Sequence, residues 1–417
     1  MDILIEPSAL SGSIEAISSK SDAHRLLICA AFADRTSSIA LSRRGEDIKA
    51  TIDCLRTIGA KIECNNNICF VEPVKDPAVR PRLNCDESGA TLRFLLPLVS
   101  AVCGGGVFGG RGRLPERPLG ELAAAMSRHK VEFSSSTLPF EIKGRLHSGD
   151  YSLAGNVSSQ YISALLMALP LVEGNSRIIL TSELKSASYV QMTLETLGKF
   201  GISAKQHDNV FELEGGQRLC SPGELRAEGD WSNAAFFLVS GALAGPVTIT
   251  GLNARTVQGD AEIVDILQSF GACTELTEES VGVSADKLTG QSVDVSNIPD
   301  LLPALAALAA FSEGETRFTN AKRLRLKESD RLFTSAAMLR GLGTDAVELE
   351  DGLAVRGGMP RGGEVDSFGD HRIAMAGAVA AAYCREATVI RNAEAVNKSY
   401  PGFFEDFRRL GGRCREI

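Results

Sequence analysis

The chain has 417 residues, of which 44% are hydrophobic and 23% charged, a composition that is ordinary for a globular protein. This length exceeds what one hydrophobic core supports, so we expect two domains or three. The formal net charge of −8 argues against a nucleic-acid-binding surface, because such surfaces carry excess positive charge. No uncharged apolar run is long enough to span a membrane, and residues 1–6 lack the layout of a signal peptide. We therefore expect a cytoplasmic protein that binds neither nucleic acid nor membrane.

The chain holds ten cysteines and five histidines, and neither set has the spacing of a metal site. The cysteines include no CxxC pair, and the histidines include no HxxxH or HExxH motif. Most of the cysteines lie in apolar runs, which is typical of small buried side chains in a reducing compartment. We therefore expect no bound metal.

Two series of predicted helices recur along the chain. Helices of the first series end just before a strand, at positions 59, 130, 201, 271, 343 and 412, which are 71, 71, 70, 72 and 69 residues apart. Apolar helices of the second series begin near Ser21, Gly89, Ser159, Trp231, Pro299 and His371. A repeat of this length is a folding unit and not a turn of a solenoid.

The first repeat shows the pattern most clearly. A strand at residues 13–17 precedes an apolar helix, and a strand at residues 38–41 precedes the helix that ends at Gly59. Two more strands, at residues 61–64 and 68–72, flank three asparagines and are predicted to form a hairpin. Each repeat is therefore predicted to have the order βαβαββ, which makes this an α/β protein.

Six such repeats fit two domains of three repeats each. We expect the boundary between Gly216 and Gly229, where residues 221–224 form a turn-rich link. If the repeats of a domain are related by rotation, their apolar helices lie parallel and the helix N-termini gather on one face. Helix N-termini attract anions, so this arrangement predicts an anion-binding cleft between the domains.

Polar residues at the starts of three apolar helices fit that prediction. The stretch at residues 18–25 places hydroxyls, Lys20 and Arg25 where an anion would bind, although an ordinary serine N-cap explains the same pattern. Gly89 starts the next apolar helix and lets a ligand approach the backbone N–H groups. Residues 156–160 can wrap a polyol or phosphate, or cap the helix that follows.

Three other segments carry further charges. The loop at residues 111–118 contains two prolines, which reduce the entropy lost in holding Arg117, but an isolated basic turn is more often solvated surface. Asp300 precedes a buried helix, and capping explains it as well as catalysis does. Residues 323–327 alternate like a strand before Ser329 or Asp330 caps the next helix.

One tempting motif fails on its context. Gly104, Gly106 and Gly109 spell GxGxxG, but they follow a helical run and lead into the arginine loop, where a dinucleotide site needs a strand before and a helix after. We predict a helix C-cap and a turn here. The chain also contains no GxxxxGK[ST] motif for nucleotide phosphates.

Taken together, these stretches resemble the 5-enolpyruvylshikimate-3-phosphate (EPSP) synthase family. The matching motifs follow the family's order and span all but the extreme ends of the chain. They are SSKSDAHR at 18–25, ESGATLR at 87–93, LPERP at 114–118, VSSQ at 157–160, IPD at 298–300, LKESDR at 326–331, GDHR at 369–372 and NKSYP at 397–401.

The resemblance implies a six-fold inside-out α/β repeat in two similar domains, each of three βαβαββ repeats. It also implies that the first strand returns to the second domain. Residues 1–16 with 229–417 would then form one domain and residues 17–228 the other, with a hinge at the crossovers near 14–20 and 224–230. No metal or organic cofactor is implied, and we expect a monomer.

The implied reaction moves the carboxyvinyl group of phosphoenolpyruvate to the 5-hydroxyl of shikimate 3-phosphate and releases phosphate, in chorismate biosynthesis. By resemblance Asp300 acts at the hydroxyl, and Glu328, with Lys20 as contender, acts at the methylene. The implied phosphoenolpyruvate ligands are Lys20, Gly89, Arg117, Gln160, Arg331, Arg372 and Lys398. The implied shikimate 3-phosphate ligands are Lys20, Ser21, Arg25, Ser158, Ser159, Gln160, Ser186, Tyr189, Asp300 and Lys327.

The chain departs from the best-known bacterial pattern at Glu87 and Arg323, where those members have asparagine. We expect Glu87 to form a salt bridge with a neighbouring arginine. One alternative is the related transferase that uses UDP-N-acetylglucosamine, but its mobile loop carries a reactive cysteine and residues 111–118 have none. Another is a non-catalytic anion- or RNA-end-binding protein, against which the net charge and the placement of Asp300 count.

Overall fold

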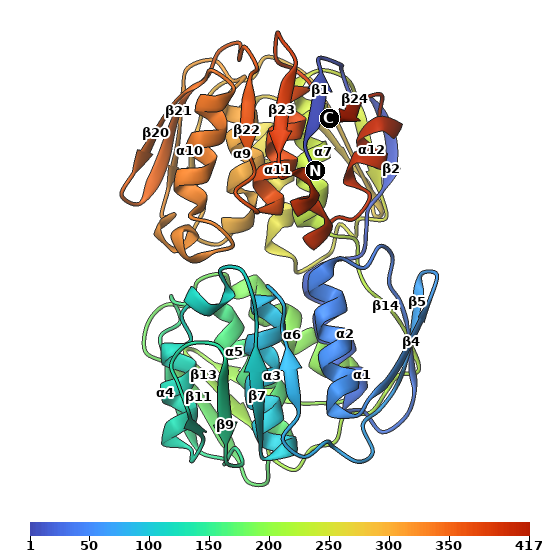
Figure 1. Cartoon of the computed structure of the whole chain (residues 1–417), viewed down its shortest axis with the longest axis vertical. Coiled ribbons are helices and arrows are strands. Elements are labelled where there is room, and N and C mark those ends of the chain that lie inside the picture. Colours follow the sequence, from blue (N-terminus) through green and yellow to red (C-terminus); the bar gives the residue numbers. More distant parts are fainter. The chain divides into compact units, whose positions relative to one another are not determined.

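The computed structural model describes residues 1–417 and divides into two compact units. Unit 1 contains Met1–Ser19 and Glu228–Ile417, and unit 2 contains Lys20–Ala227 (Figure 1). The chain therefore passes from unit 1 into unit 2 and back again. That these units are domains joined by a hinge stays a prediction. No helix of the structure combines the length and the apolar character that crossing a membrane requires.

Unit 2 contains three four-stranded sheets. Their strands are β3 (Ser37–Ala40), β4 (Lys61–Asn65), β5 (Ile68–Glu72), β6 (Arg82–Asn84), β7 (Gly105–Gly109), β8 (Glu132–Phe133), β9 (Phe140–Lys143), β10 (Asp150–Leu153), β11 (Ser176–Leu180), β12 (Ala204–His207), β13 (Val210–Leu213) and β14 (Glu224–Arg226). The strand orders are β14-β3-β5-β4, β6-β7-β9-β8 and β10-β11-β13-β12. Each sheet joins a parallel pair to an antiparallel hairpin, which is the pairing that a βαβαββ repeat produces.

Unit 1 also contains three four-stranded sheets. Their strands are β1 (Ile3–Glu6), β2 (Gly12–Glu15), β15 (Val247–Thr250), β16 (Cys273–Leu276), β17 (Ser280–Ser284), β18 (Ser292–Asp294), β19 (Glu315–Thr319), β20 (Asp345–Leu349), β21 (Gly352–Arg356), β22 (Glu364–Asp366), β23 (Thr388–Arg391) and β24 (Arg413–Glu416). The strand orders are β16-β17-β15-β2, β18-β19-β21-β20 and β22-β23-β1-β24.

The first strand of the first repeat is exchanged between the units. β2 lies parallel to β15 in unit 1, with Ile14 opposite Ile249. Its expected place beside β3 is taken by β14, with Leu225 opposite Ile39. The prediction that residues 13–17 and 38–41 belong to one repeat is therefore wrong. The two strands lie in different sheets, because the chain leaves unit 1 directly after β2. β2 thus lies in the sheet of unit 1, the placement that the resemblance implied for the first strand.

The last repeat is completed by the start of the chain. β1 lies antiparallel to both β23 and β24, with Ile3 opposite Ile390 and Glu416 (Figure 1). The Asp2 carboxylate accepts a hydrogen bond from Arg391 at 2.7 Å, which fixes this register. The two ends of the chain therefore belong to one sheet of unit 1.

Both predicted helix series are present. The apolar helices are α1 (Lys20–Ala31), α3 (Gly89–Cys103), α5 (Ser159–Ala168), α7 (Trp231–Leu243), α9 (Leu302–Ala309) and α11 (His371–Ala381). The helices of the other series are α2 (Glu46–Ile58), α4 (Gly120–Arg128), α6 (Ala187–Lys199), α8 (Ile263–Phe270), α10 (Arg331–Gly341) and α12 (Phe403–Arg409). Short 3₁₀ helices connect them: η1 (Leu114–Glu116), η2 (Leu169–Leu171), η3 (Gly259–Glu262), η4 (Pro299–Leu301), η5 (Lys322–Leu326) and η6 (Ala393–Lys398).

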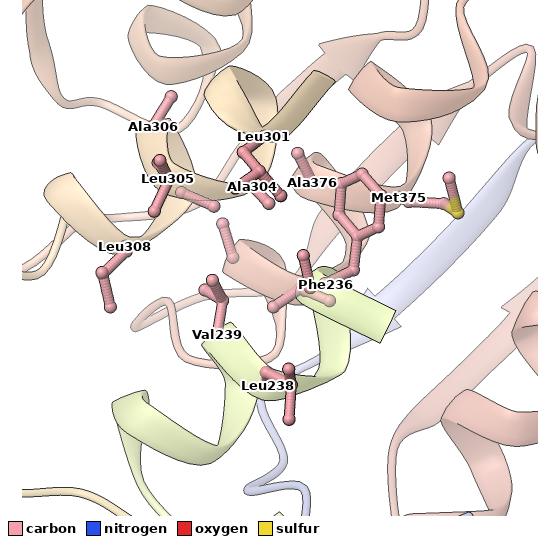
Figure 2. Packing of buried hydrophobic residues seen from close by; sticks show 14 of the residues in the cluster. Phe236, Leu238, Val239, Leu301, Ala304, Leu305, Ala306, Leu308, Met375 and Ala376 are labelled. Carbon is pink, nitrogen blue, oxygen red and sulfur yellow. The ribbon is translucent and has the colours of Figure 1, made fainter. Parts of the chain in front are cut away.

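The apolar helices form the interior of each unit because they are hydrophobic on every side. In unit 1, α7, α9 and α11 pack against one another, and Phe236, Leu305 and Met375 are fully buried among them (Figure 2). In unit 2, α3 packs closely on α5. η4 leads directly into α9. Because α7, α9 and α11 pack against one another, parts of the chain that are distant in sequence come together in the core of unit 1.

Two local predictions are wrong. Residues 323–327 are not a strand, because Lys322–Leu326 form η5 and the Arg325 side chain bonds Glu348 and the Leu349 carbonyl. In the GxGxxG stretch, Gly104 caps α3 in a left-handed conformation, as expected, but Gly105–Gly109 form β7 and not a turn. A Cβ on Gly105 would lie 2.3 Å from the Ile142 carbonyl oxygen, so glycine here permits close strand approach.

The predicted hairpin at residues 61–72 is confirmed as β4 and β5, and it carries a disulfide between Cys64 and Cys69. These residues are direct cross-strand partners, with their Cα atoms 4.0 Å apart. The expectation that cysteines act as small buried thiols is therefore wrong for this pair. Strand register places the two sulfur atoms within bonding reach, which the spacing of cysteines along the sequence does not reveal.

Candidate functional site

The first candidate group lies in unit 1 and is centred on Asp300, in η4 at the start of α9. Its Oδ1 accepts from Arg331 Nη1 at 2.7 Å and lies 3.3 Å from Lys327 Nζ. Its Oδ2 lies 3.3 Å from Arg372 Nη2. Burial raises the pKa of Asp300, but these cations outweigh burial and hold the pKa well below its usual range. Asp300 is therefore an ionised carboxylate at neutral pH.

Arg331, the first residue of α10, connects Asp300 to two more carboxylates. Its Nε donates to Asp370 Oδ2 at 2.9 Å, and its Nη2 donates to Glu328 Oε2 at 2.8 Å. Burial lowers the pKa of Arg331, but the surrounding carboxylates raise it above its ordinary value. The guanidinium is thus permanently charged, and its position is fixed by three partners on different segments.

Asp370 and Arg372 bring the start of α11 into the same group. Asp370 caps the helix by accepting from the Arg372 backbone N–H at 3.0 Å, and it also accepts from Ser329 Oγ at 2.9 Å. Burial raises its pKa, but Arg331 and His371 lower it to about 2. Arg372 Nη1 donates to the Asp300 carbonyl oxygen at 3.1 Å, so the starts of α9, α10 and α11 are tied together.

Two further cations belong to unit 1, the predicted site residue Lys398 and the departing residue Arg323. Lys398 ends η6 and is buried, and the next residue, Ser399, bonds Asn233 of α7 at 3.2 Å. Arg323 donates to the Ser296 carbonyl at 2.7 Å, and burial lowers its pKa while the charge of Asp300 acts against that. Arg323, where the best-known bacterial members have asparagine, therefore adds positive charge near Asp300.

The second candidate group lies in unit 2 and begins at Lys20, the first residue of α1. Lys20 Nζ lies 2.9 Å from Asp47 Oδ2 of α2, and both side chains are largely buried. The sequence prediction included Lys20 but missed Asp47. A carboxylate in the first turn of a helix is only a weak sign of a functional site, because acidic residues there usually do no more than interact with the helix dipole.

Gly89, Arg117 and Gln160, all predicted site residues, meet around Arg93. A Cβ on Gly89 would lie 2.5 Å from Arg93 Nη1 and 2.8 Å from Arg117 Nη1, so both guanidinium groups lie against the glycine. Arg93 Nη1 donates to Gln160 Oε1 at 2.8 Å. Arg93 was not among the predicted site residues, yet it is buried. Its spacing of one helical turn from Gly89 was the signal that could have found it.

Arg25 is buried and uses its donors inside unit 2. It donates to Thr193 Oγ1 at 2.8 Å, to the Ser21 carbonyl at 2.6 Å and to the Tyr189 carbonyl at 2.8 Å. Burial lowers the pKa of Arg25 to about 10, while Asp22 acts in the opposite direction. Arg25 therefore ties α1 to α6, and it brings the predicted residues Ser21 and Tyr189 together.

The three remaining predicted serines lie at helix starts in unit 2. Ser158 and Ser159 begin α5, and Ser158 makes no side-chain cap hydrogen bond. Ser186 precedes α6 in a left-handed conformation with a φ of 55°. The hydroxyls of these serines thus lie on α5 and α6, two helices that pack against each other.

Glu87 lies beside an arginine, as predicted. Its Oε1 is 3.6 Å from Arg111 Nη1, and Arg111 also pairs with Asp86. The pairing with Asp86 raises the pKa of Arg111. The unexpected carboxylate is therefore partly neutralised by the basic loop at residues 111–118.

Comparisons with known proteins show which family this chain belongs to. A sequence model of the family described as EPSP synthase (3-phosphoshikimate 1-carboxyvinyltransferase) matches residues 5–407. Relatives from Clostridium kluyveri and Clostridium perfringens, both named 3-phosphoshikimate 1-carboxyvinyltransferase, are 43% and 40% identical and cover 99% and 98% of this chain. Each alignment spans 98% of the relative's own length.

Solved structures show the same fold. The EPSP synthase of Acinetobacter baumannii matches with a TM-score of 0.81 and 27% identity, over 100% of both chains. An enolpyruvyl transferase from Streptomyces tendae also reaches a TM-score of 0.81, at 18% identity over 99% of this chain and 98% of its own, a likeness of fold alone. With the fold, the motif residues and the whole-length relatives in agreement, this chain belongs to the EPSP synthase family.

Proposed function

We propose that this enzyme transfers the carboxyvinyl group of phosphoenolpyruvate to the 5-hydroxyl of shikimate 3-phosphate and releases inorganic phosphate. Whole-length relatives at 43% and 40% identity carry the name of this activity. The observation that carries the proposal is Asp300, an ionised carboxylate held among Lys327, Arg331 and Arg372. Such a group supplies both a proton acceptor and fixed positive charge for anionic substrates.

Both substrates are phosphorylated anions, so their binding needs fixed cations with little freedom to reorganise. In unit 1, Arg331 and Arg372 are 1% and 4% exposed and are held by carboxylates. We assign phosphoenolpyruvate to residues of both groups. They are Lys20, Gly89, Arg117, Gln160, Arg331, Arg372 and Lys398.

Shikimate 3-phosphate combines hydroxyls with a phosphate, and the serine-rich helix starts of unit 2 offer matching donors and acceptors. We assign this substrate to Lys20, Ser21, Arg25, Ser158, Ser159, Gln160, Ser186, Tyr189, Asp300 and Lys327. The guanidinium of Arg25 is bonded to the carbonyl oxygens of Ser21 and Tyr189 and has little freedom, so we infer that it also holds these two residues in place.

The chemistry needs a proton acceptor at the 5-hydroxyl and a proton donor at the methylene of phosphoenolpyruvate. The hydroxyl oxygen attacks the central carbon while the methylene gains a proton, and the tetrahedral adduct then loses phosphate and a proton. We assign the first role to Asp300 and the second to Glu328, with Lys20 as contender. Glu328 Oε2 accepts from Arg331 Nη2 at 2.8 Å, and Asp300 Oδ1 accepts from Arg331 Nη1 at 2.7 Å. The two carboxylates therefore contact one guanidinium group.

The cations around Asp300 couple substrate binding to its basicity. In the free enzyme they hold the pKa of Asp300 well below its usual range, which makes it a weak base. A bound phosphate or carboxylate neutralises part of that positive field, so the pKa of Asp300 rises. Substrate binding therefore strengthens the base at the moment when it is needed.

Phosphate release with different acceptors tests the proposal. Shikimate 3-phosphate with phosphoenolpyruvate should release phosphate, and UDP-N-acetylglucosamine in its place should not. No release with shikimate 3-phosphate would overturn the proposed function, and release with the UDP-sugar would favour the related transferase. We also propose that the enzyme acts as a monomer in the cytoplasm, and light scattering of the purified protein tests the monomeric state.

A further inference from the structure

A chain of buried hydrogen bonds joins the first three helices of unit 2. His24 Nδ1 lies 2.7 Å from Thr51 Oγ1, and Thr51 Oγ1 lies 2.6 Å from Thr91 Oγ1. Thr91 Oγ1 in turn donates to Ser88 Oγ at 2.7 Å. None of these four residues is more than 1% exposed, so the hydrogen bonds are shielded from water, which strengthens them. The chain connects α1, α2 and α3, and α2 packs against both of the others (Figure 1).

The hydrogen-bond chain lies one helical turn beyond the ion pair of Lys20 and Asp47. Lys20 and His24 are four residues apart on α1, and Asp47 and Thr51 are four residues apart on α2. Residues with this spacing lie on the same face of a helix. The ion pair at 2.9 Å and the hydrogen bond between His24 and Thr51 are therefore successive contacts along one interface of α1 with α2.

Thr91 extends these contacts to the start of α3. It follows Gly89, an assigned phosphoenolpyruvate ligand, by two positions in the first turn of the helix. Its backbone N–H donates to Ser88 Oγ at 3.2 Å, which caps the helix. Its hydroxyl lies 3.4 Å from the Asp47 carbonyl oxygen. The Thr91 hydroxyl therefore ties the start of α3 to α2 and limits where the backbone of Gly89 can lie.

The protons of the chain have one direction. Each hydroxyl donates only one hydrogen bond, and since Thr91 uses its proton toward Ser88, Thr51 must donate to Thr91. His24 must then donate from Nδ1 to Thr51. Burial lowers the pKa of His24 to about 3, so the ring is neutral at pH 7 and its single proton lies on Nδ1. Nε2, which is buried without a hydrogen-bond partner, is then the unprotonated nitrogen.

We propose that this hydrogen-bond chain positions two residues assigned to phosphoenolpyruvate, Lys20 and Gly89. His24, Thr51 and Thr91 are then positioning residues, which act through the helix starts and do not touch the substrate. The inference rests on the proposed function, which assigns Lys20 and Gly89 to this substrate. The physical reason is that hydrogen bonds fix distance and direction, whereas apolar contacts alone permit small shifts of one helix along another.

A small shift of these helix starts is sufficient to affect the reaction. A Cβ on Gly89 would lie 2.5 Å from Arg93 Nη1, so the backbone there already lies against a guanidinium group. A displacement of about 1 Å at a substrate site can cost about 10²-fold in rate. Loss of one hydroxyl from the chain should therefore be measurable as a loss of substrate affinity.

The first test compares the wild type with Thr51→Val, which keeps the shape of the side chain and removes the hydroxyl. Phosphate release gives kcat and KM for each substrate. We expect KM to rise about five- to twentyfold for phosphoenolpyruvate and less than about threefold for shikimate 3-phosphate, because only phosphoenolpyruvate is assigned to both Lys20 and Gly89. Thr51→Ser restores the hydroxyl and should return both KM values to within about twofold of wild type.

Thr196→Val is the matched control. Thr196 is a buried threonine of α6 in the same unit, and its hydroxyl donates to the Met192 carbonyl oxygen of its own helix at 2.9 Å. Valine here removes a buried hydroxyl without breaking the chain, so both KM values should stay within about twofold of wild type. Urea unfolding of both valine variants separates a loss of stability from a loss of positioning.

Nitrogen NMR of the histidine rings, on isotope-labelled protein, gives a readout that does not depend on activity. The chemical shifts of the ring nitrogens distinguish a proton on Nδ1 from a proton on Nε2. His24→Gln identifies the His24 signal among those of the five histidines. We expect the proton on Nδ1 of His24 in the wild type and a loss of that preference in Thr51→Val.

Unchanged KM values in folded Thr51→Val, an equal rise of both KM values, or the same effect from Thr196→Val would each overturn the inference. A proton on Nε2 of wild-type His24 would also overturn it, because the hydrogen bonds would then not run toward Ser88. If Thr51→Val does not fold, Thr91→Val takes its place, and the wild-type tautomer decides if neither folds. Failure of the proposed function looks different, because the wild type would then release no phosphate with shikimate 3-phosphate.

Discussion

The Lys20 ammonium group lies 2.9 Å from the Asp47 carboxylate, and the two side chains are 16% and 6% exposed. This pair joins the first residue of α1 to the first turn of α2. The lysine proposed for both substrates therefore has a carboxylate partner, and an incoming anion shares Lys20 with Asp47.

The first prediction concerns this pair. Lys20→Met should lower kcat/KM by about 100-fold or more, because an assigned substrate cation is lost. It should also destabilise unit 2, since a largely buried carboxylate without its partner costs about 3–5 kcal/mol. The double variant Lys20→Met with Asp47→Asn should recover most of that stability in urea unfolding without recovering activity. Near-normal turnover of Lys20→Met would make Lys20 a neighbour of the helix cap only.

The second prediction concerns Asp300 as proton acceptor. Asp300→Asn keeps the shape and oxygen acceptor of the side chain but removes the base, so kcat should fall by about 10²–10⁴-fold. Near-ultraviolet circular dichroism should show a folded protein. Near-normal turnover in a folded variant would contradict the assignment of Asp300 to the hydroxyl.

The third prediction concerns Gly89. A Cβ at this position would lie 2.5 Å from Arg93 Nη1 and 2.8 Å from Arg117 Nη1, so Gly89→Ala should displace both guanidinium groups. We expect KM for phosphoenolpyruvate to rise about tenfold or more, with a smaller change in KM for shikimate 3-phosphate.

Gly120→Ala is the matched control for that substitution. Gly120 starts α4, and a Cβ there would have no neighbour within 4 Å. Alanine at this position should leave KM unchanged and should stabilise the helix by as much as about 1 kcal/mol. Equal effects of the two substitutions would show that Gly89 matters through backbone freedom and not through the arginines.

The fourth prediction is the pH dependence of stability. Asp260 has a pKa of about 7 in the folded state against 3.8 as the ordinary value, so the folded protein binds more protons between these pH values. Its contribution therefore lowers stability as pH rises from about 4 to about 7, by up to about 4 kcal/mol. Asp260→Asn removes that loss, and urea unfolding should show the variant gaining stability over wild type between pH 5 and pH 8.

Asp370 provides a comparison of opposite sign. Its pKa of about 2 lies below the ordinary 3.8, so its contribution to stability is present above pH 4 and is lost as pH falls toward 2. Asp370→Asn should therefore lower the free energy of unfolding at pH 7 and make it depend less on pH in the acid range.

The fourth prediction is contradicted if the free energy of unfolding has the same pH dependence in wild type and Asp260→Asn, because the buried Asp260 would then not be protonated.

Features set by neighbouring residues could be predicted from the sequence. Asp330 caps α10 by accepting from the backbone N–H groups of Leu332 and Phe333, as its place before a helix indicated. The helix starts at Gly89 and His371 also agree with the sequence period, because caps and apolar runs act within a few residues. The motifs at these helix starts are also runs of neighbouring residues, so they indicated the family from the sequence alone.

Features set by segments far apart in the sequence were decided only by the tertiary structure. The residue pattern alone did not show that β2 pairs with β15 and β14 with β3, which only the family resemblance implied. The pairing of Cys64 with Cys69 is local in sequence, but it depends on the register of the hairpin. Asp47, Arg93 and Asp260 acquire their partners through helices that meet only in the fold. The sequence by itself determined where the helices begin and which charges stand there, since those signals are local. Which charges face each other, and hence how readily each ionises, was decided by packing, because burial and charge–charge distance exist only in the folded chain.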